Sequence, residues 1–191
     1  MPIVHTSRTG KQYYLHTGPK RGGGVQHFFS TDPAGSLAER VPEGFEIYES
    51  IHGQVLLLRQ KPRLIRDDET ACIEQRLSKL RTNNLYKVEA RGNTLTIFES
   101  AGGFGDLRAV LGRISQCTPA AERELRERFA SYQAVMRFIL VDAEQRRFEP
   151  ERYCFRGQVD EWIPIGVAER LEKLAAKYLK HLGHDSLYDL L

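Results

Sequence analysis

One apolar run constrains the fold of this chain more than any other stretch. Residues Gln133–Asp142 carry a nearly continuous series of β-forming side chains, with one basic residue, Arg137, in the middle. A polar turn at Ala143–Arg146 follows, and Phe148–Phe155 then holds enough apolar and aromatic side chains to return as a neighbouring strand. The pattern predicts a buried strand and a second strand that returns beside it.

The same run predicts which side chains face the core. So apolar a segment is not expected at the edge of a sheet, where one side of the strand meets water. Side chains alternate between the two faces of a strand. The buried face should therefore hold either Phe138 and Leu140 or the alternate set Val135, Ile139 and Val141.

Three further strand pairs are predicted upstream of this run. Each consists of two short segments rich in β-branched or aromatic residues, joined by a turn that contains glycine. The segments are 11–16 with 25–30, 45–49 with 54–59, and 86–90 with 94–99. In the first pair, residues 17–24 form a long, glycine-rich tip. Antiparallel hairpins should therefore dominate.

Helical patterns appear in three segments. Residues 67–81 begin with acidic and end with basic side chains, and residues 119–131 pair opposite charges one turn apart. After a loop at 157–166, a third helix is expected to turn three side chains inward, Leu171, Leu174 and Tyr178, and three to water, Lys173, Lys177 and Lys180. The predicted fold class is α+β, a mainly antiparallel sheet with about three helices packed on it.

The chain of 191 residues, of which 41% are hydrophobic, is long enough for a medium-sized domain with a real core. A boundary near Pro62 divides it into a β-rich N-terminal subdomain, 1–62, and an α+β core domain, 63–191. Because about 60 residues are marginal for an independent fold, the alternative is one continuous domain.

The composition predicts a cytoplasmic protein with no membrane partner. Cys72, Cys117 and Cys154 are odd in number, far apart and without CxxC spacing, which favours neither a disulfide framework nor a zinc ribbon. The N-terminal segment lacks the apolar core of a signal peptide, and no run approaches membrane-spanning length. The net charge of +3 is small, so any basic site must be local.

Motifs for catalysis, cofactors or metals are absent from the sequence. The glycines at 22–24 beside Lys20 and Arg21 match neither GxxxxGK[ST] nor GxGxxG, and no helix start follows them. His181 and His184 have no further ligand at metal-binding spacing. Cys154 lies between two aromatic residues and is expected to be a packed thiol. We assign no catalytic residue, no metal and no cofactor.

The first 31 residues contain no Asp or Glu, although they carry four Lys or Arg side chains and several aromatic ones. Basic groups neutralise phosphates, and exposed aromatic rings stack on bases. The predicted anion- or nucleic-acid-binding residues are Lys11, Tyr13, Lys20 and Arg21. We expect a non-enzymatic binding protein that contacts nucleic acid or another polyanion weakly and without sequence preference, or else a protein partner.

The alternative is a small hydrolase or transferase whose site is assembled from residues distant in the sequence. Glu46, Glu49 and Glu99 lie on predicted strands and are its conceivable acid–base groups. Strand alternation also explains them as side chains in water. A deep pocket lined by converging ionisable groups favours the enzyme, and a convex basic face favours the binding protein.

Overall fold

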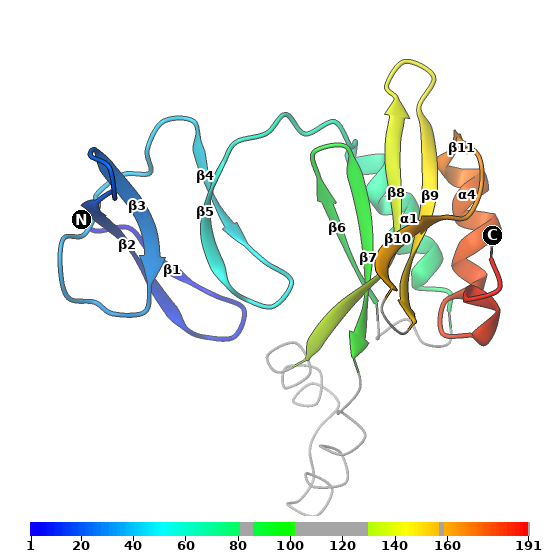
Figure 1. The fold of residues 1–191 in the computed structure, drawn as a ribbon, viewed down its shortest axis with the longest axis horizontal. Coiled ribbons are helices and arrows are strands. Elements are labelled where there is room, and N and C mark those ends of the chain that lie inside the picture. Colours follow the sequence, from blue (N-terminus) through cyan, green and yellow to red (C-terminus); the bar gives the residue numbers. More distant parts are fainter. Residues whose placement is uncertain (81–85, 102–129, 157–158, 191) are drawn as a thin grey trace, which may run out of the picture. The chain divides into compact units, whose positions relative to one another are not determined.

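The computed structural model describes residues 1–80, 86–101, 130–156 and 159–190. The chain divides into two compact units. Unit 1 comprises Met1–Gln60 with Gly102–Ser131, and unit 2 comprises Lys61–Ala101 with Tyr132–Leu191. Both contain antiparallel sheets, and unit 2 also contains helices, so the protein is α+β (Figure 1). Independent folding of residues 1–62 stays a prediction.

Unit 1 has five strands among its described residues: β1 (Val4–Thr6), β2 (Gln12–Pro19), β3 (Val25–Ser30), β4 (Phe45–Glu49) and β5 (Val55–Arg59). The first three form a sheet in the order β1–β2–β3, and β4 pairs with β5, all antiparallel. The two hairpins predicted here are confirmed. β2 is longer than predicted, because its ladder with β3 continues to Pro19↔Val25. The tip of this hairpin therefore contracts to residues 20–24.

The sheet of unit 2 contains β6 (Tyr86–Arg91), β7 (Thr94–Ala101), β8 (Ser131–Asp142), β9 (Arg147–Arg156), β10 (Val159–Pro164) and β11 (Glu169–Arg170). Its order is β10–β9–β8–β7–β6, and β11 also pairs with β9. The predicted pairing of β8 with β9 is confirmed, in a register that places Phe138 opposite Pro150 and Leu140 opposite Phe148.

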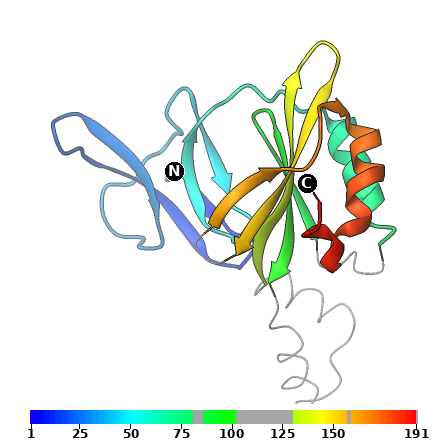
Figure 2. The ribbon, with the colours of Figure 1, turned by 45° about the vertical axis from the view of Figure 1, so that its right-hand side comes forward.

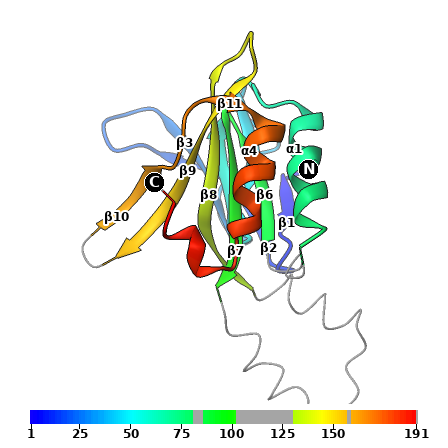
Figure 3. The same cartoon turned by 90° about the vertical axis from the view of Figure 1, so that its right-hand side faces the viewer.

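Two α-helices, α1 (Asp67–Leu77) and α4 (Leu171–Tyr178), lie on the same side of this sheet (Figures 2 and 3). Two short 3-10 helices, Leu179–His181 and Asp185–Leu187, follow α4. Among the described residues, none of the helices has the length and apolar character needed to cross a lipid bilayer.

The core of unit 2 decides between the two predicted faces of β8. Phe138 and Leu140 are 0% and 5% exposed, whereas Val141 is 49% exposed. The first alternative is therefore confirmed, although Val135 is buried as well. The predicted register of the last helix is also confirmed, with buried Leu171, Leu174 and Tyr178 and exposed Lys173, Lys177 and Lys180.

The helices differ from the predictions in number and in extent. The described residues hold two α-helices rather than about three, and the predicted helix 119–131 lies outside them except at its end, where Ser131 already begins β8. α1 ends at Leu77 instead of residue 81. α4 starts at Leu171 because the two residues before it pair with β9 as β11. The predicted loop at 157–166 contains β10, which is also paired along its whole length with β9.

Candidate functional site

The four predicted anion-binding residues lie at opposite ends of β2. Lys20 and Arg21 belong to the tip that joins β2 to β3, whereas Lys11 and Tyr13 lie where β2 begins. A strand advances by about 3.3 Å per residue, so the two ends are separated by about 30 Å along the backbone. The structure therefore brings the four residues into two places rather than one.

The tip and the adjoining strand ends form an exposed arm, residues 19–26, in which every residue is solvent-exposed. Three successive glycines, Gly22 to Gly24, have positive φ angles of 99°, 95° and 92°. L side chains rarely adopt this conformation, which explains the glycines. The turn is closed by hydrogen bonds from Lys20 N to Gly24 O (3.0 Å) and from Gly23 N to Lys20 O (3.0 Å). Figure 2 shows the β2–β3 hairpin extending away from the other strands of unit 1.

The base of the arm is held by an aromatic contact. The rings of His16 and Phe28 stack at a centroid distance of 5.4 Å and an interplanar angle of 13°. His16 is buried, and its Nε2 lies 2.9 Å from the carbonyl oxygen of Asp32. Phe28 nevertheless remains 43% exposed, and Val25 is 68% exposed. The arm and its base together thus combine two cations with apolar surface that the described part of the chain leaves in water.

At the other end of β2, unit 1 contains an open hollow of about 510 Å³. It lies between the turn that joins β1 to β2 and the turn that joins β4 to β5. Its described lining residues are Thr9, Gly10, Lys11, Tyr13, His52, Gly53, Gln54, Ala130 and Ser131. Lys11 and Tyr13 were predicted as site residues, whereas His52 and Gln54 were not. Nothing in the local sequence around residue 52 indicates that it meets residue 11.

Close packing of the two turns builds this hollow. Gly53 is buried with a φ of 74°, and a Cβ atom at this position would lie 2.7 Å from Thr9 Cγ2. Glu49 joins the same turns, because it accepts hydrogen bonds from His5 Nε2 (2.9 Å) and from Arg8 N (2.7 Å). The Arg8 guanidinium donates to the carbonyl oxygen of Ile51. These contacts fix the hollow's two walls to each other.

The hollow carries no acidic side chain among its described lining residues. The side chains of Lys11, Tyr13 and His52 make no hydrogen bond or ion pair within the described part of the chain. Glu49 is directed to His5 and Arg8, as described above, so it does not neutralise Lys11. An ammonium group, a phenol and an imidazole are left available to a ligand with acceptor oxygens.

No family model, no curated protein and no solved structure matches this chain. The assignment of a function therefore depends on the geometry of its own residues.

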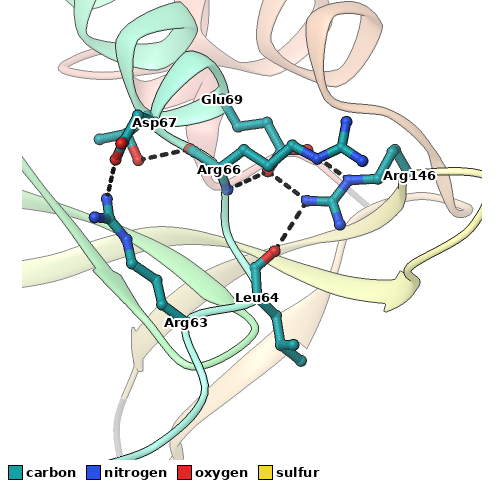
Figure 4. A network of polar contacts seen from close by, with 7 residues as sticks. Arg63, Leu64, Arg66, Asp67, Glu69 and Arg146 are labelled. Carbon is teal, nitrogen blue, oxygen red and sulfur yellow. Dashed lines mark hydrogen bonds and ion pairs between the residues drawn. The ribbon is translucent and has the colours of Figure 1, made fainter.

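Unit 2 contains a buried ion pair between Arg146 and Glu69, whose role is structural (Figure 4). Arg146 donates from Nε to Glu69 Oε1 (2.9 Å) and from Nη2 to Glu69 Oε2 (2.5 Å), and also to the carbonyl oxygen of Leu64 (3.1 Å). Glu69 accepts a further bond from Arg66 N (2.8 Å), the residue that caps α1. Arg63 pairs with Asp67 at 2.7 Å. This network ties the start of α1 to the β8–β9 turn.

A second cluster in unit 2, which the sequence did not predict, surrounds Trp162. The Arg137 guanidinium lies 4.3 Å from the centre of the Trp162 ring, and its Nε donates to Glu151 Oε2 (2.5 Å). The Tyr153 ring meets Trp162 edge-on at 4.9 Å, and its hydroxyl donates to Asp160 Oδ1 (2.7 Å). This hydrogen bond raises the pKa of Tyr153. The sequence feature that could have indicated this cluster is Arg137, the one basic residue in an otherwise apolar strand.

Glu46, Glu49 and Glu99, the acid–base groups predicted for a hydrolase or transferase, do not form a common site within either unit. Glu46 is exposed on β4, and Glu49 serves the contacts with His5 and Arg8. Glu99 lies in unit 2 and accepts a hydrogen bond from the Tyr86 hydroxyl (3.0 Å). Among the described residues, no three His, Cys, Asp or Glu side chains lie close enough together to hold a metal ion. Cys154 is buried, as expected for a packed thiol.

Proposed function

We propose that unit 1 is a non-enzymatic module that binds anionic polymers, nucleic acid among them, through the sheet formed by β1, β2 and β3. The observation that carries this proposal is the exposed arm, residues 19–26, whose tip presents Lys20 and Arg21 with no acidic residue anywhere in the first 31 positions. An exposed tip with two cations contacts a phosphate backbone without reading bases.

The distribution of charge in residues 1–60 supports the proposal. All five acidic residues of this segment follow position 31, and one of them, Glu49, is occupied by His5 and Arg8. The cations of the arm and of Lys11 therefore act on a ligand without an adjacent internal counter-charge on the same sheet. Local cations of this kind raise the concentration of an anionic partner, and salt screens the attraction.

The length of β2 suggests the size of the partner. Lys11 and Lys20 are about 30 Å apart along the strand. In duplex DNA each strand carries one phosphate per 3.4 Å, so a polymer that reaches both ends spans about nine phosphates. Shorter polyanions should bind through the arm alone and more weakly.

Fluorescence anisotropy with labelled single- and double-stranded oligonucleotides, recorded over a series of salt concentrations, tests this function. Removing two cations with Lys20→Gln and Arg21→Gln should weaken binding and flatten the slope of log K against log salt by about one to two. The matched control is Lys177→Gln with Lys180→Gln, which removes the same charge from exposed positions on α4 and on the 3-10 helix that directly follows it.

Because residues 19–26 contribute nothing to the core and because Lys177 and Lys180 are exposed, both double variants should unfold at the temperature of the parent protein. Equal losses in both variants would mean that overall charge, and not the arm, drives binding. An absence of binding at tens of micromolar protein and low salt would reject nucleic acid as the partner and point instead to a protein contact.

A further inference from the structure

We infer that the hollow at the start of β2 is a subsite for a phosphate monoester group, supplied either by the end of a nucleic-acid strand or by a small phosphorylated compound. The inference rests on the proposed function, because it assigns a ligand group to one end of the same anion-binding sheet. It adds a place where a doubly charged terminal phosphate is held, whereas the arm contacts backbone phosphates at its surface.

The first argument is the set of free polar groups in the hollow. Lys11 offers an ammonium group, His52 an imidazole and Gln54 a carboxamide, and these side chains make no polar contact within the described part of the chain. Each supplies N–H donors. A phosphate monoester presents three terminal oxygens, which can accept bonds from several such donors at once, and charge-assisted bonds of this type are the strong ones.

The second argument is the position of Tyr13. Its side chain is partly buried and lines the hollow, yet its hydroxyl makes no hydrogen bond within the described residues. Other tyrosines of the protein do bond: Tyr14 donates to Gln12 Oε1 (3.1 Å), and Tyr178 donates to the carbonyl oxygen of Ile165 (2.7 Å). A partly buried phenol is normally hydrogen-bonded. The unused donor of Tyr13 is therefore available to a ligand.

The third argument is the lining and the volume of the hollow. The described lining contains no carboxylate, the group that attracts a metal ion or an ammonium group. The volume of about 510 Å³ lies within the range of small-ligand sites. It exceeds the needs of a bare phosphate ion, which leaves room for the sugar or other group that carries the phosphate.

Two labelled oligonucleotides of one sequence, with and without a phosphate at the 5′ end, test the subsite. The phosphorylated strand should bind the parent protein about fivefold to tenfold more tightly, the gain expected from one or two charge-assisted hydrogen bonds. Tyr13→Phe and Lys11→Gln should reduce this ratio towards one. Tyr14→Phe is the matched control for the phenol, and Lys20→Gln, which lies at the other end of β2, should weaken both strands equally.

Inorganic phosphate, titrated at constant ionic strength against the ¹⁵N-labelled full chain, gives an independent measurement. The backbone amide signals of the β1–β2 and β4–β5 turns should shift in the parent protein and shift less in Tyr13→Phe. If the oligonucleotides bind equally with and without the terminal phosphate and these signals stay unchanged, the subsite is refuted while the proposed function stands. If phosphate shifts the turns but no oligonucleotide binds, the subsite stands and the nucleic-acid function fails.

Discussion

Replacing Arg146 by Ala should destabilise unit 2 strongly, because it isolates a buried carboxylate. The side chains of Arg146 and Glu69 are 19% and 8% exposed, and the substitution removes two hydrogen bonds to Glu69 and one to the carbonyl oxygen of Leu64. Glu69 would keep a single donor, Arg66 N, for a charge that remains out of water. Loss of one partner from a buried ion pair costs about 3–5 kcal/mol.

Partial exposure of the arginine places the expected loss near the lower limit, at about 3 kcal/mol. For a unit of this size that corresponds to a fall in melting temperature of about 10 °C or more. Urea denaturation followed by circular dichroism measures the change in free energy of unfolding, provided that the slope with denaturant stays constant. Because the pair is coupled, Glu69→Met combined with Arg146→Met should cost less than Arg146→Ala alone.

The backbone of Arg146 supplies a control within the same position. Its φ angle of 52° is unfavourable for an L residue by about 1 kcal/mol, and glycine avoids this cost. Arg146→Gly should therefore be about 1 kcal/mol less destabilising than Arg146→Ala, although it removes the same side chain. A loss below about 1 kcal/mol for Arg146→Ala would show that the pair behaves as an exposed one and would refute the argument.

Two further predictions concern the sheet of unit 2. Phe138→Ala should lower the free energy of unfolding by about 3–5 kcal/mol because it deletes a fully buried ring, whereas Val141→Ala, three residues along the same strand, should lower it by less than about 1 kcal/mol because this side chain is half exposed. Similar losses for the two variants in denaturant melts would contradict the register. Asp160→Asn should lower the pKa of Tyr153 towards that of a free tyrosine, since the hydrogen bond to the carboxylate is the main cause that raises it, ahead of desolvation and of the carboxylate's charge. The folded state favours the protonated phenol, so this small stabilisation is present at neutral pH and is lost as pH rises through the pKa in the folded protein. Carbon-13 NMR of the labelled phenol carbon follows the titration, and an unchanged midpoint in Asp160→Asn would assign the shift to another cause.

Much of the secondary structure was predictable because it depends on neighbours along the chain. Alternation of apolar side chains and glycine-containing turns located both hairpins of unit 1 and the β6–β7 hairpin of unit 2. The spacing of Leu171, Leu174 and Tyr178 placed the buried face of α4. The strands that were missed depend on a partner: β10 and β11 exist because each finds hydrogen-bonding groups on β9, and their own residues do not indicate this pairing.

The candidate site divides in the same way. Lys20 and Arg21 could be predicted as exposed cations, because a glycine-rich tip between two strands has no means of burying them. The hollow could not be predicted, since it requires the turn around Gly53 to pack against Thr9, more than 40 positions earlier in the chain. For Tyr13, the residue type suggested a contact with a ligand, and only the packing of two turns placed its side chain in the hollow.

The sequence by itself therefore determined the period of each element, the excess of basic residues in the first 31 positions and the absence of catalytic and metal-binding motifs. The tertiary structure decided which face of β8 is buried, that Glu69 meets Arg146 and that Lys11 shares a hollow with His52. Periodicity and turn geometry act over a few residues and can be read locally. Contacts between distant positions form only when whole elements pack, because the burial gained in the complete fold must offset the entropy lost in bringing distant parts of the chain together.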